Sequence, residues 1–179
     1  MTQTARIYGG SLFDLAAEEQ LTGTILEQMN VIRGLFRENP DYVRLLSEPS
    51  IPAEERHKLI DDAFGQDAEH YLVNFLKLLC DRNLLREYAG CCDEFTRRYN
   101  VLNGIAEAVV TSAVPLTAAQ SEALKARLEK LSGKTVNLVS RIDPGVVAGL
   151  KVELEGTQLD GTVSGRLDGI SRKINEIIV

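Results

Sequence analysis

The spacing of the apolar residues changes abruptly at Asn103-Gly104, and this change constrains the fold of the 179-residue chain more than any other feature. Before this point, apolar residues recur every three or four positions, which is the spacing of amphipathic helices. After it, residues 105–113 are rich in valine and alanine without a helical stripe, so we predict a β-strand there. Helices and strands segregated in this way are typical of α+β proteins. We therefore expect a mainly α, α+β chain with two domains, 1–104 and 105–179.

The first domain is predicted to be a six-helix bundle. Its amphipathic segments are joined by short links, which is typical of compact antiparallel bundles. The break at Asn39-Pro40 is one such link, because proline cannot continue a helix that precedes it. We expect helices at 4–17, 18–38, 42–46 and 53–64, one that begins after Asp67, and one that begins after Asn83 and ends near Leu102.

The second domain is predicted to be a small α/β domain. Thr117 and Gln120 form a capping box at the start of a helix that ends at Gly133. Because only about 75 residues follow the boundary, this domain buries a small core and should be marginally stable without a partner. We expect strands at 105–113, 136–142 and 146–154, a turn at 155–157, and a final helix after residue 162 with the apolar stripe Leu167, Ile170, Ile174 and Ile177.

The composition excludes several classes of protein. Apolar residues make up 44% of the chain and charged residues 26%, which suits a soluble domain with a core. The formal net charge of −6 disfavours a nucleic-acid binder and a polybasic membrane anchor, both of which need clustered basic residues. No apolar run approaches the roughly 20 residues that span a bilayer. The N-terminus lacks the features of a secretory signal. We expect a cytosolic protein, or one that docks on a membrane complex from the cytosolic side.

The sequence contains no recognisable catalytic or metal-binding motif. Residues 156–162 have the glycine spacing of a phosphate-binding loop but lack its lysine. Neither histidine belongs to a zinc motif. The cysteines Cys80, Cys91 and Cys92 have neither metal-binding nor redox spacing. We therefore expect no catalytic residue, no metal and no cofactor, with a cysteine-dependent enzyme as a remaining alternative.

Three segments carry a resemblance to a known family. The C-terminal segment combines Asp143, Ala148-Gly149 and the run DGTVSGRL at 160–167. The segment ARIYGGSLF occupies residues 5–13, and NFL at 74–76 precedes CDRNLL at 80–85. Together they resemble the delta subunit of F-type ATP synthases, the family of the mitochondrial oligomycin-sensitivity conferral protein. They are similar to its C-terminal signature, first helix and fifth helix. This chain departs from the family at Ala148, where a glycine is frequent, and at Gly9-Gly10, where Ala or Lys-Ala is frequent.

The resemblance implies a mechanical role and no enzyme activity. A protein of this family is a stator component that links the catalytic head of ATP synthase to the peripheral stalk and resists rotor torque. The resemblance implies that the helical bundle binds the N-terminal helices of the alpha subunits and that the C-terminal domain binds the C-terminal region of the b subunit. It implies a peripheral protein at the cytoplasmic face of the bacterial cell membrane, with membrane contact only through the complex. The alternative is a helical adaptor or regulatory module outside the synthase.

The first and fifth predicted helices carry more apolar surface than one core-facing stripe needs. On the fifth helix, Leu72, Phe75 and Leu79 are enough to face the core, which leaves a second apolar face. Surplus apolar faces on two neighbouring helices can form a groove for an amphipathic partner helix. The resemblance favours such a groove, although the same residues could instead complete the core. The candidate groove residues are Tyr8, Leu12, Leu15, Val73, Leu76 and Cys80.

Two glycines complete the set of candidate partner-binding residues. Gly9 lies inside the first predicted helix, where glycine costs about 1 kcal/mol relative to alanine. This cost is either tolerated or explained by close approach of another helix. Gly149 lies in the middle of the predicted strand 146–154, where glycine usually marks close backbone approach. We expect it to contribute to docking on the b subunit.

Overall fold

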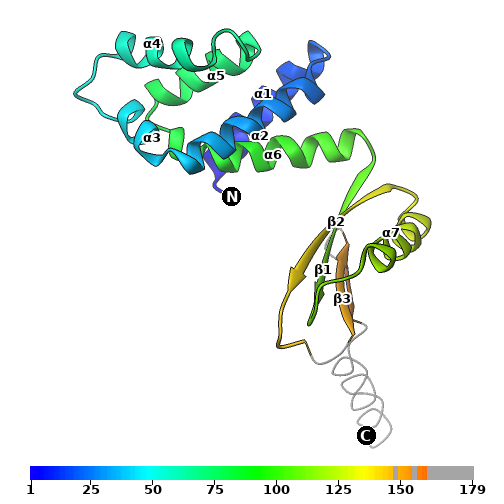
Figure 1. Cartoon of the computed structure of the whole chain (residues 1–179). Helices are drawn as coiled ribbons and strands as arrows, with labels where there is room; N and C mark the ends of the chain where they lie inside the picture. Colours follow the sequence, from blue (N-terminus) through cyan, green and yellow to red (C-terminus); the bar gives the residue numbers. More distant parts are fainter. Residues whose placement is uncertain (147–148, 155–156, 161–179) are drawn as a thin grey trace, which may run out of the picture. The chain divides into compact units, whose positions relative to one another are not determined.

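The structure is a computed structural model that describes residues 1–146, 149–154 and 157–160 (Figure 1). It divides into two compact units, Met1–Tyr99 and Asn100–Val179. Helices form the first unit, and the described part of the second unit is a small sheet with one helix. The expectation of a mainly α, α+β chain is therefore confirmed.

The chain up to Leu102 contains six α-helices and one short 3-10 helix (Figure 1). The predicted helix ends at residues 38, 46 and 64 are confirmed, and a capping residue and a proline set where the first and third helices begin. Thr2 caps the first helix by accepting a hydrogen bond from the Ala5 amide at 3.1 Å. Pro40 occupies the first turn of the third. The helices are α1 Gln3–Glu18, α2 Thr22–Glu38, α3 Pro40–Leu46, α4 Ala53–Phe64, α5 His70–Asp81, η1 Leu85–Glu87 and α6 Tyr88–Leu102.

The turn between α1 and α2 corrects the prediction that the second helix begins at residue 18. Gln20 adopts a left-handed conformation with φ 59°. The Leu21 amide donates to the Ala16 carbonyl at 2.8 Å, and the Gln20 amide donates to the Ala17 carbonyl at 3.3 Å. These bonds form a Schellman-type end to α1. The sequence does not reveal this end, because the left-handed position holds glutamine instead of the usual glycine.

The first unit is organised around one apolar core. Ile25, Met29 and Ile32 of α2 are buried, and so is Phe95 of α6. The Tyr88 hydroxyl, at the start of α6, donates to the Met29 carbonyl at 3.2 Å, which satisfies its polar group inside the core. The core therefore connects the middle of α2 to α6 and supports the other helices, whose outer faces lie at the surface.

The second unit contains a four-stranded sheet in its described residues, with strand order β2-β1-β3-β4. β1 runs parallel to β2 and antiparallel to β3, and β3 runs antiparallel to β4. The predicted capping box of Thr117 and Gln120 starts α7, and Gly133 ends it with φ 69°. The elements are β1 Ile105–Ser112, α7 Ala118–Ser132, β2 Thr135–Ile142, β3 Leu150–Leu154 and β4 Thr157–Asp160.

One face of this sheet forms the core of the second unit. Ala106, Ala108 and Val110 alternate along β1 and are all buried. Leu128 of α7 and Val152 of β3 are buried in the same cluster. The parallel pairing of β1 and β2 requires a crossover connection, and α7 supplies it.

The predicted third strand, 146–154, is too long. β3 begins at Leu150, and Gly149 lies before it with φ 107°, a conformation that does not continue a strand. The Val146 amide donates to the Asp143 carbonyl at 3.0 Å in a turn. The predicted turn at 155–157 is also too long, because β4 begins at Thr157. The predicted final helix, Ala148 and most of the run at 160–167 lie outside the described residues.

Candidate functional site: a groove between α1 and α5

An apolar groove runs between α1 and α5 in the first unit. Its volume is about 330 Å³. Leu12 and Phe75 are 3% and 7% exposed and form its floor, whereas Leu15 and Leu78 are 37% and 42% exposed and form its rim. The lining residues are Tyr8, Ser11, Leu12 and Leu15 from α1 and Tyr71, Asn74, Phe75 and Leu78 from α5.

The spacing of these residues explains why two helices can form one groove. Tyr8, Leu12 and Leu15 follow one another at four and three positions, so they lie along one face of α1. Tyr71 and Leu78 on α5 are seven positions apart and lie on one face by the same argument. Apolar side chains from two helices that line one open space suit the apolar face of an amphipathic helix.

The polar groups of the groove lie at its edge. The Ser11 hydroxyl donates to the Ile7 carbonyl at 2.9 Å, so its donor is already used within α1. Burial, together with the Glu19 carboxylate, raises the pKa of Tyr71 above its ordinary value of 10.0. The Tyr71 hydroxyl therefore stays protonated near neutral pH. The floor of the groove offers a partner apolar contact and no charge.

The structure corrects the predicted α5 side of this groove. Val73 is 5% exposed, and Leu76 and Cys80 are fully buried. The Cys80 thiol donates to the Leu46 carbonyl of α3 at 3.1 Å, which places it inside the bundle. These three residues belong to the core, so the prediction that they form an outer face is wrong. The reason is that α5 is apolar on most of its circumference, and its sequence does not show which apolar face the neighbouring helices cover.

The groove residues that the sequence reasoning missed are those of the opposite face of α5. Tyr71, Asn74 and Leu78 are rotated by more than a quarter turn from Leu76. The polar Asn74 in an otherwise apolar run indicates in the sequence which face of α5 is exposed, because polar residues usually mark the solvent side of a helix. On α1, by contrast, the predicted residues Tyr8, Leu12 and Leu15 all line the groove.

Gly9 lies on a different face of α1 and contacts the chain's own α6. A Cβ atom at Gly9 would lie 2.6 Å from the Cys91 carbonyl oxygen, so only glycine allows this approach. Gly9 is buried against α6 of the same chain, so the close helix approach is internal and the prediction that Gly9 binds a partner is wrong. Gly149 lies in the second unit beside β3 and lines a separate cavity with Leu116 and Leu124.

The cysteines are poorly suited to nucleophilic chemistry. All three are buried and unpaired. Burial raises the pKa of Cys91 to about 11 and that of Cys92 to about 12. Because the reactive form of cysteine is the thiolate, these thiols are almost entirely in the unreactive form near neutral pH.

The part of the chain that the structure describes shows neither a metal-binding cluster nor a membrane-spanning helix. Within residues 1–146, 149–154 and 157–160, no group of three or more His, Cys, Asp or Glu side chains is placed to hold a metal ion. In the same part of the chain, no helix combines the length and apolar character needed to cross a membrane. The single histidine–carboxylate contact, between His57 and Asp81 at 2.8 Å, lies on the surface of the described first unit.

Comparisons with known proteins agree on one family. A family model described as the ATP synthase delta (OSCP) subunit matches residues 4–174. The ATP synthase subunit delta of Anoxybacillus flavithermus is 32% identical over 171 residues, 95% of this chain and 96% of that protein. That of Alkaliphilus oremlandii is 28% identical over 172 residues, 96% of each. A chain of the Toxoplasma gondii mitochondrial ATP synthase hexamer matches with a TM-score of 0.71 at 17% identity, covering 97% of this chain and 98% of that one. The last likeness concerns the fold alone.

Proposed function

This chain belongs to the ATP synthase delta (OSCP) subunit family, and from that premise we propose that it is the stator component that links the catalytic head of ATP synthase to the peripheral stalk. The role is mechanical. A link of this kind must hold two partners at once while the rotor applies torque between them. It therefore needs two binding surfaces on stable folded units, and no reactive group.

The groove between α1 and α5 is the observation that carries the proposal. It combines a buried floor at Leu12 and Phe75 with an apolar rim at Leu15 and Leu78. A helix that lays an apolar stripe into such a groove removes apolar surface from water on both sides, and this burial favours the complex. We assign the N-terminal helix of an alpha subunit of the catalytic head as its occupant.

The second unit is assigned to the peripheral stalk. We propose that it binds the C-terminal region of the b subunit through the apolar cavity beside Gly149. Val114 at this cavity is 69% exposed, and Leu116 and Leu124 also line it. An exposed apolar residue beside an apolar cavity supports a protein partner at this position.

The remaining features of the proposal follow from the role. The chain acts without catalysis or a cofactor, in agreement with its buried, protonated cysteines. It is a peripheral protein at the cytoplasmic face of a bacterial cell membrane and meets the membrane only through the complex. It does not bind nucleic acid, in agreement with its net charge of −6.

Rim substitutions test the groove without disturbing the core. We expect the full chain to bind a synthetic peptide of the alpha subunit N-terminus, with the affinity measured by isothermal titration. Leu15→Glu and Leu78→Glu each place a carboxylate in the proposed contact, so each should weaken binding at least tenfold, about 1.4 kcal/mol. Val31→Glu is the matched control, because Val31 is 63% exposed on α2 and does not line the groove.

The outcomes separate this function from the alternative adaptor. Folded rim variants that bind the peptide as tightly as Val31→Glu would exclude the groove as the alpha site. Purification of the intact chain from detergent-solubilised membranes without alpha and b subunits would favour a helical adaptor outside the synthase.

A further inference from the structure

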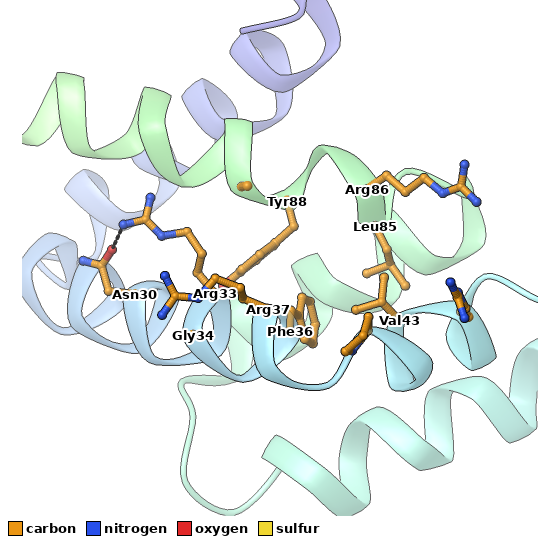
Figure 2. A pocket seen from close by; sticks show the side chains of 12 residues that line it. Asn30, Arg33, Gly34, Phe36, Arg37, Val43, Leu85, Arg86 and Tyr88 are labelled. Carbon is orange, nitrogen blue, oxygen red and sulfur yellow. Dashed lines mark hydrogen bonds between the residues drawn. The ribbon is translucent and has the colours of Figure 1, made fainter.

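A second cavity of the first unit has a lining unlike that of the α1–α5 groove. Its volume is about 680 Å³, and it lies where the C-terminal half of α2, α3 and the η1–α6 segment meet. Its floor is apolar and well packed: Leu85 and Tyr88 are each 2% exposed, and the Phe36 and Tyr88 rings lie 5.2 Å apart. Figure 2 shows Phe36, Val43 and Leu85 together in the middle of this cavity.

Four arginines surround this apolar floor, and we call the site the arginine pocket. Arg33 and Arg37 of α2 and Arg86 of η1 are labelled in Figure 2. Arg44 of α3 also lines the pocket, so three elements converge on it. No Asp or Glu is among its lining residues. The chain as a whole has a net charge of −6, so this concentration of positive charge runs against its average.

Two of the four arginines are free to receive a ligand. Arg33 donates to Asp93 at 3.0 Å and to Asn30 at 2.9 Å, and Arg44 pairs with Asp41 at 3.0 Å. Within the described residues, Arg37 and Arg86 have no carboxylate partner. They belong to different elements, so a ligand that contacts both would bridge α2 and η1.

We propose that the arginine pocket is a docking site for an acidic peptide segment that also carries apolar side chains. Guanidinium groups bind carboxylates through paired hydrogen bonds, and Arg37 and Arg86 have this capacity unused. The apolar floor beneath them requires an apolar side chain to displace water from it. A free phosphate would satisfy the arginines and leave the floor uncovered. Nucleic acid is disfavoured because the rest of the chain is acidic.

Charge-matched peptides test this proposal. We would label three synthetic amphipathic peptides that share one leucine face and carry glutamate, glutamine or lysine at the flanking positions. Their binding to the full chain would be followed by fluorescence anisotropy at low and at high salt. The glutamate peptide should bind at least tenfold more tightly than the other two. Added salt should weaken its binding, because it screens exposed charges.

Paired variants locate the site. Arg37→Gln with Arg86→Gln should weaken binding of the glutamate peptide at least tenfold. Arg6→Gln with Arg82→Gln removes the same charge from two exposed positions outside the pocket and should leave binding unchanged. Leu78→Glu, at the α1–α5 groove, should also leave it unchanged. Failure of the alpha-subunit assignment therefore does not affect this result.

Four outcomes would overturn the proposal. They are equal affinity for the three peptides, absence of saturable binding, equal losses in the two arginine pairs, and a loss that occurs with Leu78→Glu instead. Inorganic phosphate that shifts the NMR signals of Arg37 and Arg86, while no peptide binds, would identify a small-anion site and reject the peptide.

Discussion

The two units of the chain bury apolar side chains to very different extents. The core of the first unit contains 21 buried apolar residues, whereas the core in the described part of the second contains seven. Buried apolar area is the main stabilising contribution to a fold. The first unit therefore forms a complete core from its own helices, whereas each buried contact in the second unit contributes a larger share of that unit's stability. The first unit can therefore bind a partner through an outer helix face without losing stability from its core.

Helix α5 has one face in the core and another face at the groove. Leu72, Leu76 and Leu79 are fully buried in the core, whereas Leu78 on the opposite face is 42% exposed at the groove. On α7 of the second unit, by comparison, Leu128 alone is buried and Leu131 is 70% exposed. A single substitution on α5 can therefore separate stability from binding.

Leu76→Asp should have the largest effect on this comparison. A carboxylate at a fully buried position without a partner costs several kcal/mol, so we expect the first unit to unfold. Leu78→Asp is the control at the exposed face and should change the melting temperature little. Circular dichroism melts of the two full-length variants measure the difference. Equal melting temperatures would contradict the assignment of Leu76 to the core face and of Leu78 to the exposed face of α5.

Acid should destabilise the first unit through Glu94. Its buried carboxylate accepts hydrogen bonds from Arg97 at 2.7 and 2.9 Å and from Arg98 at 2.9 Å, and these hold its pKa at about 2, below the ordinary 4.5. Because the folded-state pKa is lowered, the stabilisation is complete above about pH 4.5 and is lost as the pH falls towards 2.

The expected loss is about 2 to 3 kcal/mol in the free energy of unfolding. Urea unfolding at pH 6 and pH 3 measures it, with Glu94→Gln as the variant that should remove this part of the pH dependence. An unchanged difference between the two pH values in Glu94→Gln would assign the acid effect to other groups.

Gly9→Ala and Gly34→Ala should have opposite signs. A Cβ at Gly9 would overlap the Cys91 carbonyl and force α1 away from α6, which should cost about 1 to 2 kcal/mol. A Cβ at Gly34 meets nothing within 4 Å, so alanine there should stabilise α2 by up to about 1 kcal/mol. Denaturant midpoints report both changes. If both variants were more stable than the parent, the close approach of α1 to α6 would be refuted.

The effect of Gly149→Ala should be confined to the second unit. The φ of 107° at Gly149 is unfavourable for a residue with a Cβ, at a cost of about 1 kcal/mol or more. Hydrogen exchange followed by mass spectrometry should show faster exchange in β3 and unchanged exchange in α1–α6. Gly104 also has a positive φ, 61°, but lies outside β3, so Gly104→Ala should leave exchange in β3 unchanged. Faster exchange throughout the first unit in Gly149→Ala would show that the two cores are coupled.

The sequence predicts those elements whose limits depend on local chemistry. Helix α4 has its predicted bounds because Pro52 and Gly65 flank it, and α7 begins at the predicted capping box. The left-handed turn at Gln20 was missed because its residue type does not require that conformation. The identity of the outward face of α5 depends on which helices pack against it, and this is a property of the tertiary structure.

In the proposed function, an alpha-subunit helix binds between α1 and α5 of the first unit. Hydrogen exchange of the full chain with and without the alpha N-terminal peptide tests it directly. Slower exchange should appear in α1 and α5 and should be absent from β1, β2 and β3. In Leu78→Glu, the same peptide at the same concentration should give no such protection. Protection located in the sheet, or equal protection in the wild type and Leu78→Glu, would contradict the claim.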